Sequence, residues 1–154
     1  MTELVDSPSP APPNAGPRLT YLVKQLEMAE RACMEEVLAP HGMTLHQYTA
    51  LSLLERRDGL SSAQLARRHY VTPQAMNQLV ATLERDGLIR RTADAANRRI
   101  LRASLTDNGR ATLAACHAAV DQLERRMLAE FNSDQEQEFR AALERSLRGL
   151  ADSA

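Results

Sequence analysis

Aromatic residues are scarce in this chain of 154 residues: they make up 3% of it, and tryptophan is absent. A core must therefore be built from leucine, alanine, valine, isoleucine and methionine. Hydrophobic residues reach 44%, yet few short runs have the β-branched composition of strands. This length is typical of one domain with a real core, so the composition favours a single, mainly helical domain.

Cysteine is also rare, and the two that are present, Cys33 and Cys116, have no close-pair spacing. Both fall in apolar helical patterns, which argues against a disulfide framework and a zinc knuckle. The four histidines are scattered, so we expect no metal and no cofactor. Long apolar runs are missing, and the N-terminus lacks the basic and apolar segments of a signal peptide. We therefore expect a cytoplasmic protein without a membrane partner.

Lysine occurs once, at Lys24, and the net charge of the chain is -1. The distribution of charge says more than its sum. The span 56–102 holds ten arginines and four acidic residues, a local balance of +6, whereas the rest of the chain sums to −7. A basic middle between acidic flanks is typical of a protein that binds a polyanion.

Proline is concentrated at the start of the chain, where residues 1–17 hold five of the seven prolines. Such a segment buries little apolar surface, so we expect a disordered tail. The remainder, residues 18–154, is expected to be one domain. Apolar residues at helical spacing predict a first helix over 19–38, which Pro40 and Gly42 end.

Capping residues divide the middle of the chain into three more helices. A second helix runs to about Arg56, a third is short, and a fourth has a proline at its first position, where the missing N–H costs nothing. The caps are Thr44 for the second helix, Ser61 or Ser62 for the third, and Thr72 before Pro73 for the fourth, which Gly87 ends.

Two strand candidates follow, over 88–91 and 100–105, with a turn between them at 94–97. Thr106 then caps a long fifth helix. Ser133, with Glu136 three residues on, has the spacing of a capping box and opens a last helix. Two short helices and a two-stranded hairpin in this order predict a winged helix-turn-helix, mainly α with a small β-hairpin wing and flanking dimerisation helices. Helices that bracket such a unit usually pair with a second copy.

The fourth helix has the pattern of a DNA-reading helix. Met76, Leu79, Val80 and Leu83 share one face and are expected in the core, which leaves amide side chains outward. Asparagine and glutamine can pair with adenine in the major groove, and an arginine at a hairpin tip suits a narrow minor groove. The predicted DNA contacts are Ser62, Arg68, Thr72, Pro73, Gln74, Ala75, Asn77, Gln78, Thr82, Arg91, Arg98 and Arg99. By strand alternation, Arg99 points away from Arg98, towards Asp94 or a phosphate.

The chain resembles the MarR family of bacterial transcriptional regulators over roughly residues 19–150. The resemblance rests on GMTLHQYTALSLL, on SSAQLARRHYVTPQAMNQLVATLERDGLI, and on ADAANRRILRASLTDNG. In the last segment Ala95 replaces the proline of the family pattern, and Asn97 replaces its second acid, which weakens any ion pair that acid would make within the wing. The matching positions are Asp94, Arg98, Arg99, Leu105, Thr106 and Gly109.

The resemblance implies a homodimer with the first, fifth and sixth helices at its interface, and a DNA-binding part at about 44–106 between dimerisation helices at about 18–39 and 106–151. It further implies a repressor that binds duplex DNA at a pseudo-palindromic operator and is released by a small, often aromatic, ligand. We place that effector pocket near Met28, His46 and Tyr48. Two alternatives stay open: a winged-helix module for protein interaction, and a regulator that senses thiol oxidation. No pattern for catalysis stands out, so we do not expect an enzyme.

Overall fold

The computed structural model describes residues 16–151, so the predicted tail over 1–17 lies almost wholly outside the described residues. The helices and strands follow the predicted order and confirm the mainly helical fold with a small sheet. They are α1 (Leu19–Leu38), the short 3-10 helix η1 (Ala39–His41), α2 (Leu45–Arg56), β1 (Leu60–Ser61), α3 (Ser62–His69), α4 (Pro73–Arg85), β2 (Ile89–Ala93), β3 (Leu101–Leu105), α5 (Asp107–Met127) and α6 (Ser133–Ala151).

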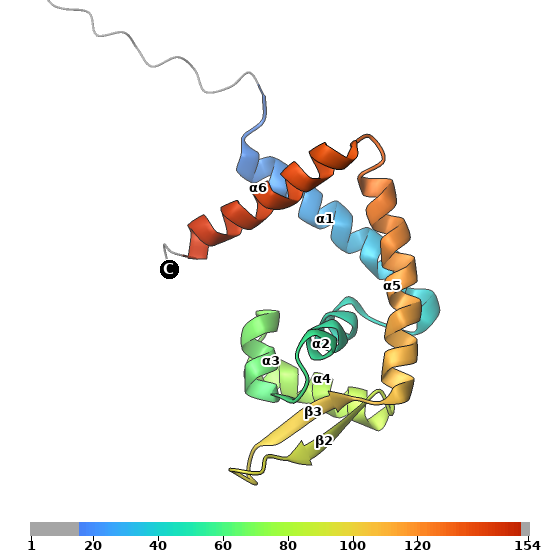
Figure 1. The fold of residues 1–154 in the computed structure, drawn as a ribbon, viewed down its shortest axis with the longest axis vertical. Helices are drawn as coiled ribbons and strands as arrows, with labels where there is room; N and C mark the ends of the chain where they lie inside the picture. The colour runs from blue at the N-terminus through green and yellow to red at the C-terminus, as the bar shows by residue number, and fades with distance from the viewer. Residues whose placement is uncertain (1–15, 152–154) are drawn as a thin grey trace, which may run out of the picture.

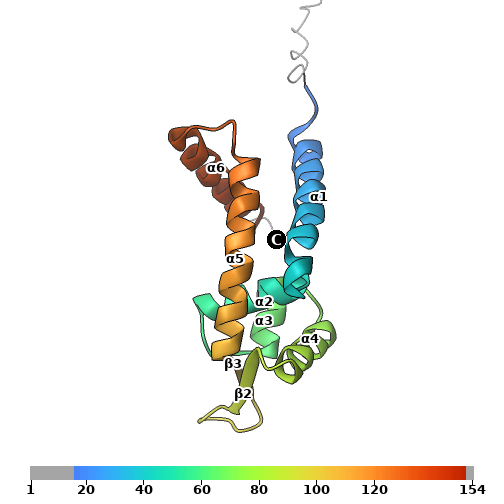
Figure 2. The ribbon, with the colours of Figure 1, turned by 90° about the vertical axis from the view of Figure 1, so that its right-hand side faces the viewer.

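The chain divides into a head, formed by α2, α3, α4 and the sheet, and two long supporting helices, α1 and α5. Helices α2, α3 and α4 gather with the sheet at one end, and the loop between β2 and β3 projects beyond them (Figure 1). Helix α5 rises from β3 away from this end, and α1 runs beside it (Figure 2). Helix α6 turns back from the top of α5. It overlaps α1 in the first view but stands apart from it in the second.

The sheet has the strand order β1-β3-β2, and both pairings are antiparallel. Strand β1 was not predicted, because two residues are too few to show an alternating pattern. It forms where Leu60 lies opposite Ala103, extended by a hydrogen bond of 3.1 Å from the Gly59 N–H to the Ala103 carbonyl. The hairpin strands are shifted from the predicted 88–91 and 100–105 by one or two residues at their ends.

Side-chain caps fix where the head's helices begin. Thr44 and Ser61 each accept a hydrogen bond from the backbone N–H of a glutamine three residues on, and that glutamine's side chain accepts one in return. These are capping boxes, and they select Ser61 over Ser62 as the cap of α3. Thr72 accepts from the Ala75 N–H at 3.1 Å, which confirms it as the cap of α4.

The start of α6 corrects one prediction. The capping box is formed one residue earlier than expected, between Asn132 and Gln135 rather than between Ser133 and Glu136. Asn132 Oδ1 accepts from the Gln135 N–H at 2.9 Å, and Gln135 Oε1 accepts from the Asn132 N–H at 3.0 Å. Both pairs have the same spacing, and an asparagine cap is at least as favourable as a serine cap, so the spacing rule alone does not choose between them.

The hydrophobic core lies in the head and at its junction with α5. Met76 and Val80 of α4, which were predicted in the core, are buried, as are Leu51 and Leu54 of α2 and Leu113 of α5. Gly109 lies in the first turn of α5 against the backbone of Leu88: a Cβ at this glycine would stand 2.0 Å from the Leu88 carbonyl oxygen. This close approach fixes the position of α5 against Leu88, the residue before β2.

The two outer helices contribute little to this core. Only Met34 and Leu38 of α1 are buried, and α6 has no buried residue at all. An amphipathic helix of 19 residues without one fully buried side chain has little of the packing that stabilises helices in proteins. Among residues 16–151, no helix is long and apolar enough to cross a membrane.

Candidate nucleic-acid interface

Helix α4 presents three amide side chains on its outer surface. Gln74, Asn77 and Gln78 are exposed, and none makes a side-chain hydrogen bond to any other described residue. Ala75 is exposed beside them, whereas Thr82 is half-buried. Free amides on a helix surface are the groups that pair with adenine N6 and N7 in the major groove. The surface therefore has the form that was predicted from the sequence.

The start of α4 is also suited to an anion. Thr72 caps the helix by accepting from the Ala75 N–H, and Pro73 at the first position has no N–H, so the Gln74 N–H is the group of the first turn left for an anion. Arg68 of α3 is exposed nearby in the chain and donates from Nη1 to the Gln64 carbonyl of its own helix at 3.2 Å. Ser62 lies half-buried in the first turn of α3.

The loop between β2 and β3 is held by its own side chains. Asp94 Oδ1 accepts from the backbone N–H groups of Ala96 and Asn97, and Asn97 Oδ1 accepts from the Arg99 N–H at 3.1 Å. Asn97 therefore keeps a hydrogen bond within the wing although it replaces the acid of the family pattern. Arg98 and Arg99 are exposed, and neither guanidinium has a partner among residues 16–151.

Asp94, one of the two partners that alternation offered for Arg99, forms its ion pair with another arginine. Its second oxygen binds Arg102 of β3 and not Arg99. Arg102 also donates from Nη1 to the Gly59 carbonyl at 3.0 Å, so this side chain ties the wing to β1. The Arg102 guanidinium, helped by two backbone N–H groups, lowers the pKa of Asp94. The alternation of side chains along a strand did not predict this pair, because Asp94 and Arg102 are eight positions apart and lie on opposite sides of a loop.

Arg91 also has an intramolecular partner. Its Nε donates to Glu84 Oε2 at 2.8 Å, and its backbone N–H donates to the other oxygen of that carboxylate at 3.2 Å. The guanidinium lowers the pKa of Glu84, mainly through this hydrogen bond. The pair joins the last turn of α4 to β2. The contact between Arg91 and DNA stays a prediction, whereas its contact with Glu84 is observed.

The three residues predicted for one effector pocket lie in separate places. His46 lines a hollow of about 330 Å³ between α2 and α4, together with Ala75, Gln78 and Thr82. Tyr48 lines another of about 340 Å³ between α2 and α5. Met28 borders neither of them and is 59% exposed on α1.

The hollow between α2 and α5 contains a chain of hydrogen bonds that the sequence did not predict. Tyr48 Oη lies 2.9 Å from His117 Nδ1, and His117 Nε2 lies 2.9 Å from Glu55 Oε2. One tautomer satisfies both contacts: the phenol donates to Nδ1, and Nε2–H donates to the carboxylate. Burial raises the pKa of Tyr48, which keeps this phenol protonated. Tyr48 of α2 and His117 of α5, which are 69 positions apart, thus join the head to its supporting helix.

The cysteines are free thiols in different surroundings. Cys116 is buried, and burial raises the pKa of its thiol, which disfavours the reactive thiolate. Cys33 is half-buried, and its sulfur accepts a hydrogen bond from Arg126 Nη2 at 3.2 Å. Among residues 16–151, no three histidine, cysteine or acidic side chains are grouped so as to hold a metal ion.

Comparisons with known proteins agree with this geometry. The model of the MarR family matches residues 41–100. The HTH-type transcriptional repressor Rv2887 of Mycobacterium tuberculosis is 39% identical over 127 residues, which are 82% of this chain and 91% of that protein. The chain belongs to the MarR family. It is a helix-turn-helix transcriptional regulator of the kind its relatives represent.

Two solved structures of that mycobacterial MarR-family protein share the fold. The one in complex with DNA has a TM-score of 0.73 and 36% identity, and the match covers 84% of this chain and 98% of that one. The one in complex with salicylic acid has a TM-score of 0.70 and 37% identity, and covers 85% of this chain and 97% of that one.

Proposed function

We propose that this MarR-family protein is a homodimeric repressor that binds a pseudo-palindromic operator, one head to each half-site, and is released by a small aromatic acid. It would act on DNA in the cytoplasm. The observation that carries the proposal is the outer surface of α4, where Gln74, Asn77 and Gln78 are exposed without intramolecular partners. No enzymatic activity is part of it.

The wing supplies the second DNA contact in this proposal. Arg98 and Arg99 extend from a loop that Asp94 and Asn97 hold in place. The backbone of the loop therefore loses little conformational entropy when the two arginines bind DNA. Arg98 is assigned to the minor groove and Arg99 to a phosphate. Gln78 and Asn77 read base edges in the major groove, and Thr72 and Arg68 contact the backbone beside them. The mycobacterial relative has been solved in complex with DNA, which supports DNA as the ligand of this surface.

The homodimer is inferred from apolar side chains that one protomer leaves in water. They lie on α1 and on the far end of α5 with α6, where they include Leu19, Leu22, Val23, Leu26, Met127, Phe131, Leu143, Leu147 and Leu150. Leu19 is 77% exposed and Leu150 is 74% exposed. A single copy rarely exposes so much apolar surface on helices that bury so little, and a second copy provides a matching surface by symmetry.

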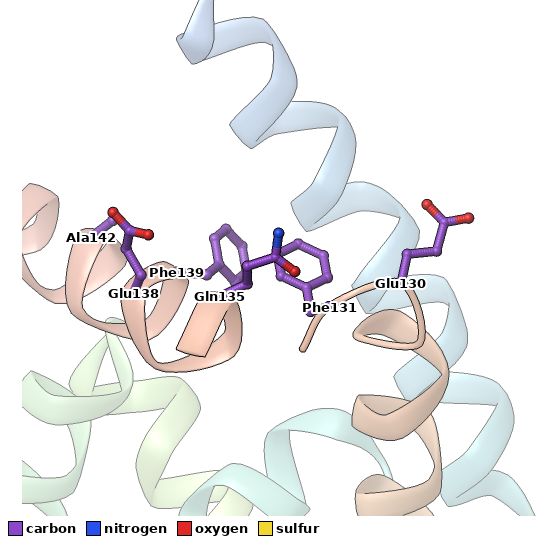
Figure 3. A pocket seen from close by; sticks show the side chains of 6 residues that line it. All are labelled: Glu130, Phe131, Gln135, Glu138, Phe139 and Ala142. Carbon is purple, nitrogen blue, oxygen red and sulfur yellow. The ribbon is translucent and has the colours of Figure 1, made fainter. Parts of the chain in front are cut away.

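The corner between α5 and α6 belongs to this surface. The rings of Phe131 and Phe139 face one another with centroids 5.6 Å apart, and Gln135 lies between them in the view of Figure 3. They line a hollow of about 470 Å³ together with Glu130 and Glu138. An aromatic hollow rimmed by glutamates is suited to apolar side chains of a partner helix, and we assign it to the dimer interface.

The effector site is proposed between α2 and α5, because a ligand there touches both the head and its support. The hollow of about 340 Å³ has the size of a small aromatic molecule. Arg56 on its wall is suited to a carboxylate, and Leu53 is suited to a ring. The salicylic acid complex of the mycobacterial relative supports an acid of this class. The ligand acts only through its different affinities for the DNA-bound and released arrangements.

A titration on DNA tests the proposal. The purified full chain is titrated on the intergenic DNA upstream of its own gene and on a shuffled duplex of the same composition, at several salt concentrations. We expect tighter, salt-dependent binding of two protomers per site on the natural DNA. Equal affinity for the two duplexes, with the fold intact by circular dichroism, would contradict the proposal.

Calorimetry tests the effector site separately. Salicylate is titrated into the wild type, Arg56→Gln and His46→Ala, the last of which alters the other hollow. We expect Arg56→Gln to weaken binding about tenfold or more, because a charge-assisted hydrogen bond is lost, and His46→Ala to leave it unchanged. The reverse order would place the ligand between α2 and α4.

A further inference from the structure

The turn between α3 and α4 contains a residue that the proposed function leaves unused. Tyr70 has φ 56 and ψ 37, and within residues 16–151 it is the only non-glycine residue with a positive φ. Its side chain is 95% exposed, more than any other large hydrophobic side chain that the structure describes. Its hydroxyl and ring have no partner among the described residues.

This conformation disfavours a side chain of any kind. In the left-handed region the Cβ crowds the backbone, so glycine adopts it at lower cost than tyrosine does. The exposed ring gains nothing from burial in return. Tyr70 thus stabilises the protomer neither through its backbone conformation nor through packing. Compared with glycine at this position, it adds only an exposed phenol.

The residues on either side of Tyr70 are anchored. His69 Nε2 donates to the His46 carbonyl of α2 at 3.0 Å. Val71 packs against the core, and its N–H donates to the Ala66 carbonyl at 3.2 Å. The Tyr70 N–H is directed to the same carbonyl. The phenol is therefore presented from a fixed turn, with only its own side-chain torsions free.

The turn also lies at the edge of the DNA-facing surface. Exposed Arg67 and Arg68 precede it on α3, and Thr72, the cap of α4, comes two residues after Tyr70. When a helix-turn-helix docks, its first helix crosses the backbone and the N-terminal end of the second enters the major groove. A turn between them is carried alongside the sugar-phosphate chain at the groove's rim.

We propose that Tyr70 is a DNA-backbone contact, in which the phenol O–H donates a hydrogen bond to a phosphate oxygen and the ring packs on the adjoining deoxyribose. This inference rests on the proposed DNA-binding function. Tyrosine is among the side chains that make such contacts, and they position a protein on the duplex without reading sequence. The phenol is neutral, so the contact releases no counterion, unlike an arginine contact.

The salt dependence of DNA binding distinguishes this neutral contact from the contacts of the arginines. Tyr70→Phe removes the hydroxyl alone, and we expect operator affinity to fall about 3- to 10-fold, the value of one net hydrogen bond. Random duplex should weaken by the same factor. The slope of log affinity against log salt should stay that of the wild type, whereas Arg98→Ala should make it shallower.

Tyr70→Gly provides a second measurement with an opposite sign. Glycine relieves the left-handed conformation, so the thermal midpoint should stay unchanged or rise, while DNA affinity falls by more than in Tyr70→Phe because the ring is lost as well. Tyr21→Phe is the matched control, since Tyr21 is an exposed tyrosine, 57% accessible, on α1 and away from the head. It should bind DNA as the wild type does.

Several outcomes would overturn the inference. Wild-type affinity in both Tyr70 variants would remove Tyr70 from the interface, and a loss confined to the operator would mean a base contact. Loss in Tyr70→Gly alone would refute the phosphate hydrogen bond. Normal DNA binding with lost repression in a reporter would assign Tyr70 to a protein partner. If the wild type itself shows no preference for its upstream DNA, the proposed function fails and this inference fails with it.

Discussion

Arg91 of β2 binds Glu84 of α4 through its guanidinium and its backbone N–H, with 2.8 Å between Nε and Oε2. The contact joins the last turn of the reading helix to the wing. Their relative position is therefore set by a hydrogen-bonded ion pair as well as by the apolar core beneath.

Removing one member of this pair should loosen the joint without unfolding the head. We expect Glu84→Gln and Arg91→Gln each to lower the thermal midpoint by about 1–3 °C, and the double variant to lower it no further, since both partners are partly exposed. The same Arg91→Gln variant tests the predicted contact of Arg91 with DNA: if Glu84 is the sole partner of Arg91, the salt dependence of DNA binding stays that of the wild type. A shallower slope would show that Arg91 contacts phosphate.

The ion pair between Asp94 and Arg102 predicts a pH dependence of stability. The pKa of Asp94 is lowered in the folded protein, so its contribution is present above the ordinary value of about 4 and is lost as pH falls through the lower, folded value. Asp94→Asn should reduce the thermal midpoint at pH 7, and the difference from the wild type should shrink below about pH 4. A difference that stays constant from pH 7 to pH 3 would contradict this.

Gly109 should tolerate no side chain. Its missing Cβ would stand 2.0 Å from the Leu88 carbonyl oxygen, so Gly109→Ala must displace α5 or the chain before β2. We expect a loss of about 1–3 kcal/mol in the free energy of unfolding, measured by urea denaturation. Gly149→Ala is the matched control, because nothing lies within 4 Å of its Cβ position and alanine favours a helix. Equal stability of the two variants would refute the contact.

The two DNA-contacting elements should fail in different ways. Gln78→Ala should cost about 1–3 kcal/mol on the operator and relax the preference at one base pair. Arg98→Ala should lose most affinity on sites with A·T-rich flanks and reduce the salt slope by about one. Fluorescence anisotropy on a set of operator variants measures both. Equal losses on every sequence would mean that this division of roles is wrong.

The apolar surface of α6 predicts a dimer that one charge can break. Leu147 is 68% exposed in the protomer, so Leu147→Asp should leave each protomer folded while burying a charge at the interface. We expect monomers in sedimentation velocity and weak DNA binding. Ile100→Asp is the control, since Ile100 is a partly exposed apolar residue on the wing, 38% accessible, and should remain dimeric. A dimeric Leu147→Asp protein would exclude Leu147 from the interface.

The sequence by itself determined helices α1 to α6, the hairpin and their order, because the signals for them are local. Thr44, Thr72 and Pro73 mark helix starts within one turn of the chain, and the spacing of Met76, Val80 and Leu83 assigns the buried face of α4. The same spacing left the amides of that helix outward. The basic span over 56–102 then indicated a polyanion.

Only the tertiary structure decided which distant groups meet. Asp94 pairs with Arg102, Tyr48 with His117, and Leu60 with Ala103, and each contact depends on how far the chain turns between the partners. The predicted effector residues were separated because His46 and Tyr48, two positions apart on α2, face different neighbours. Local patterns fix which face of a helix is apolar, whereas packing fixes what that face meets.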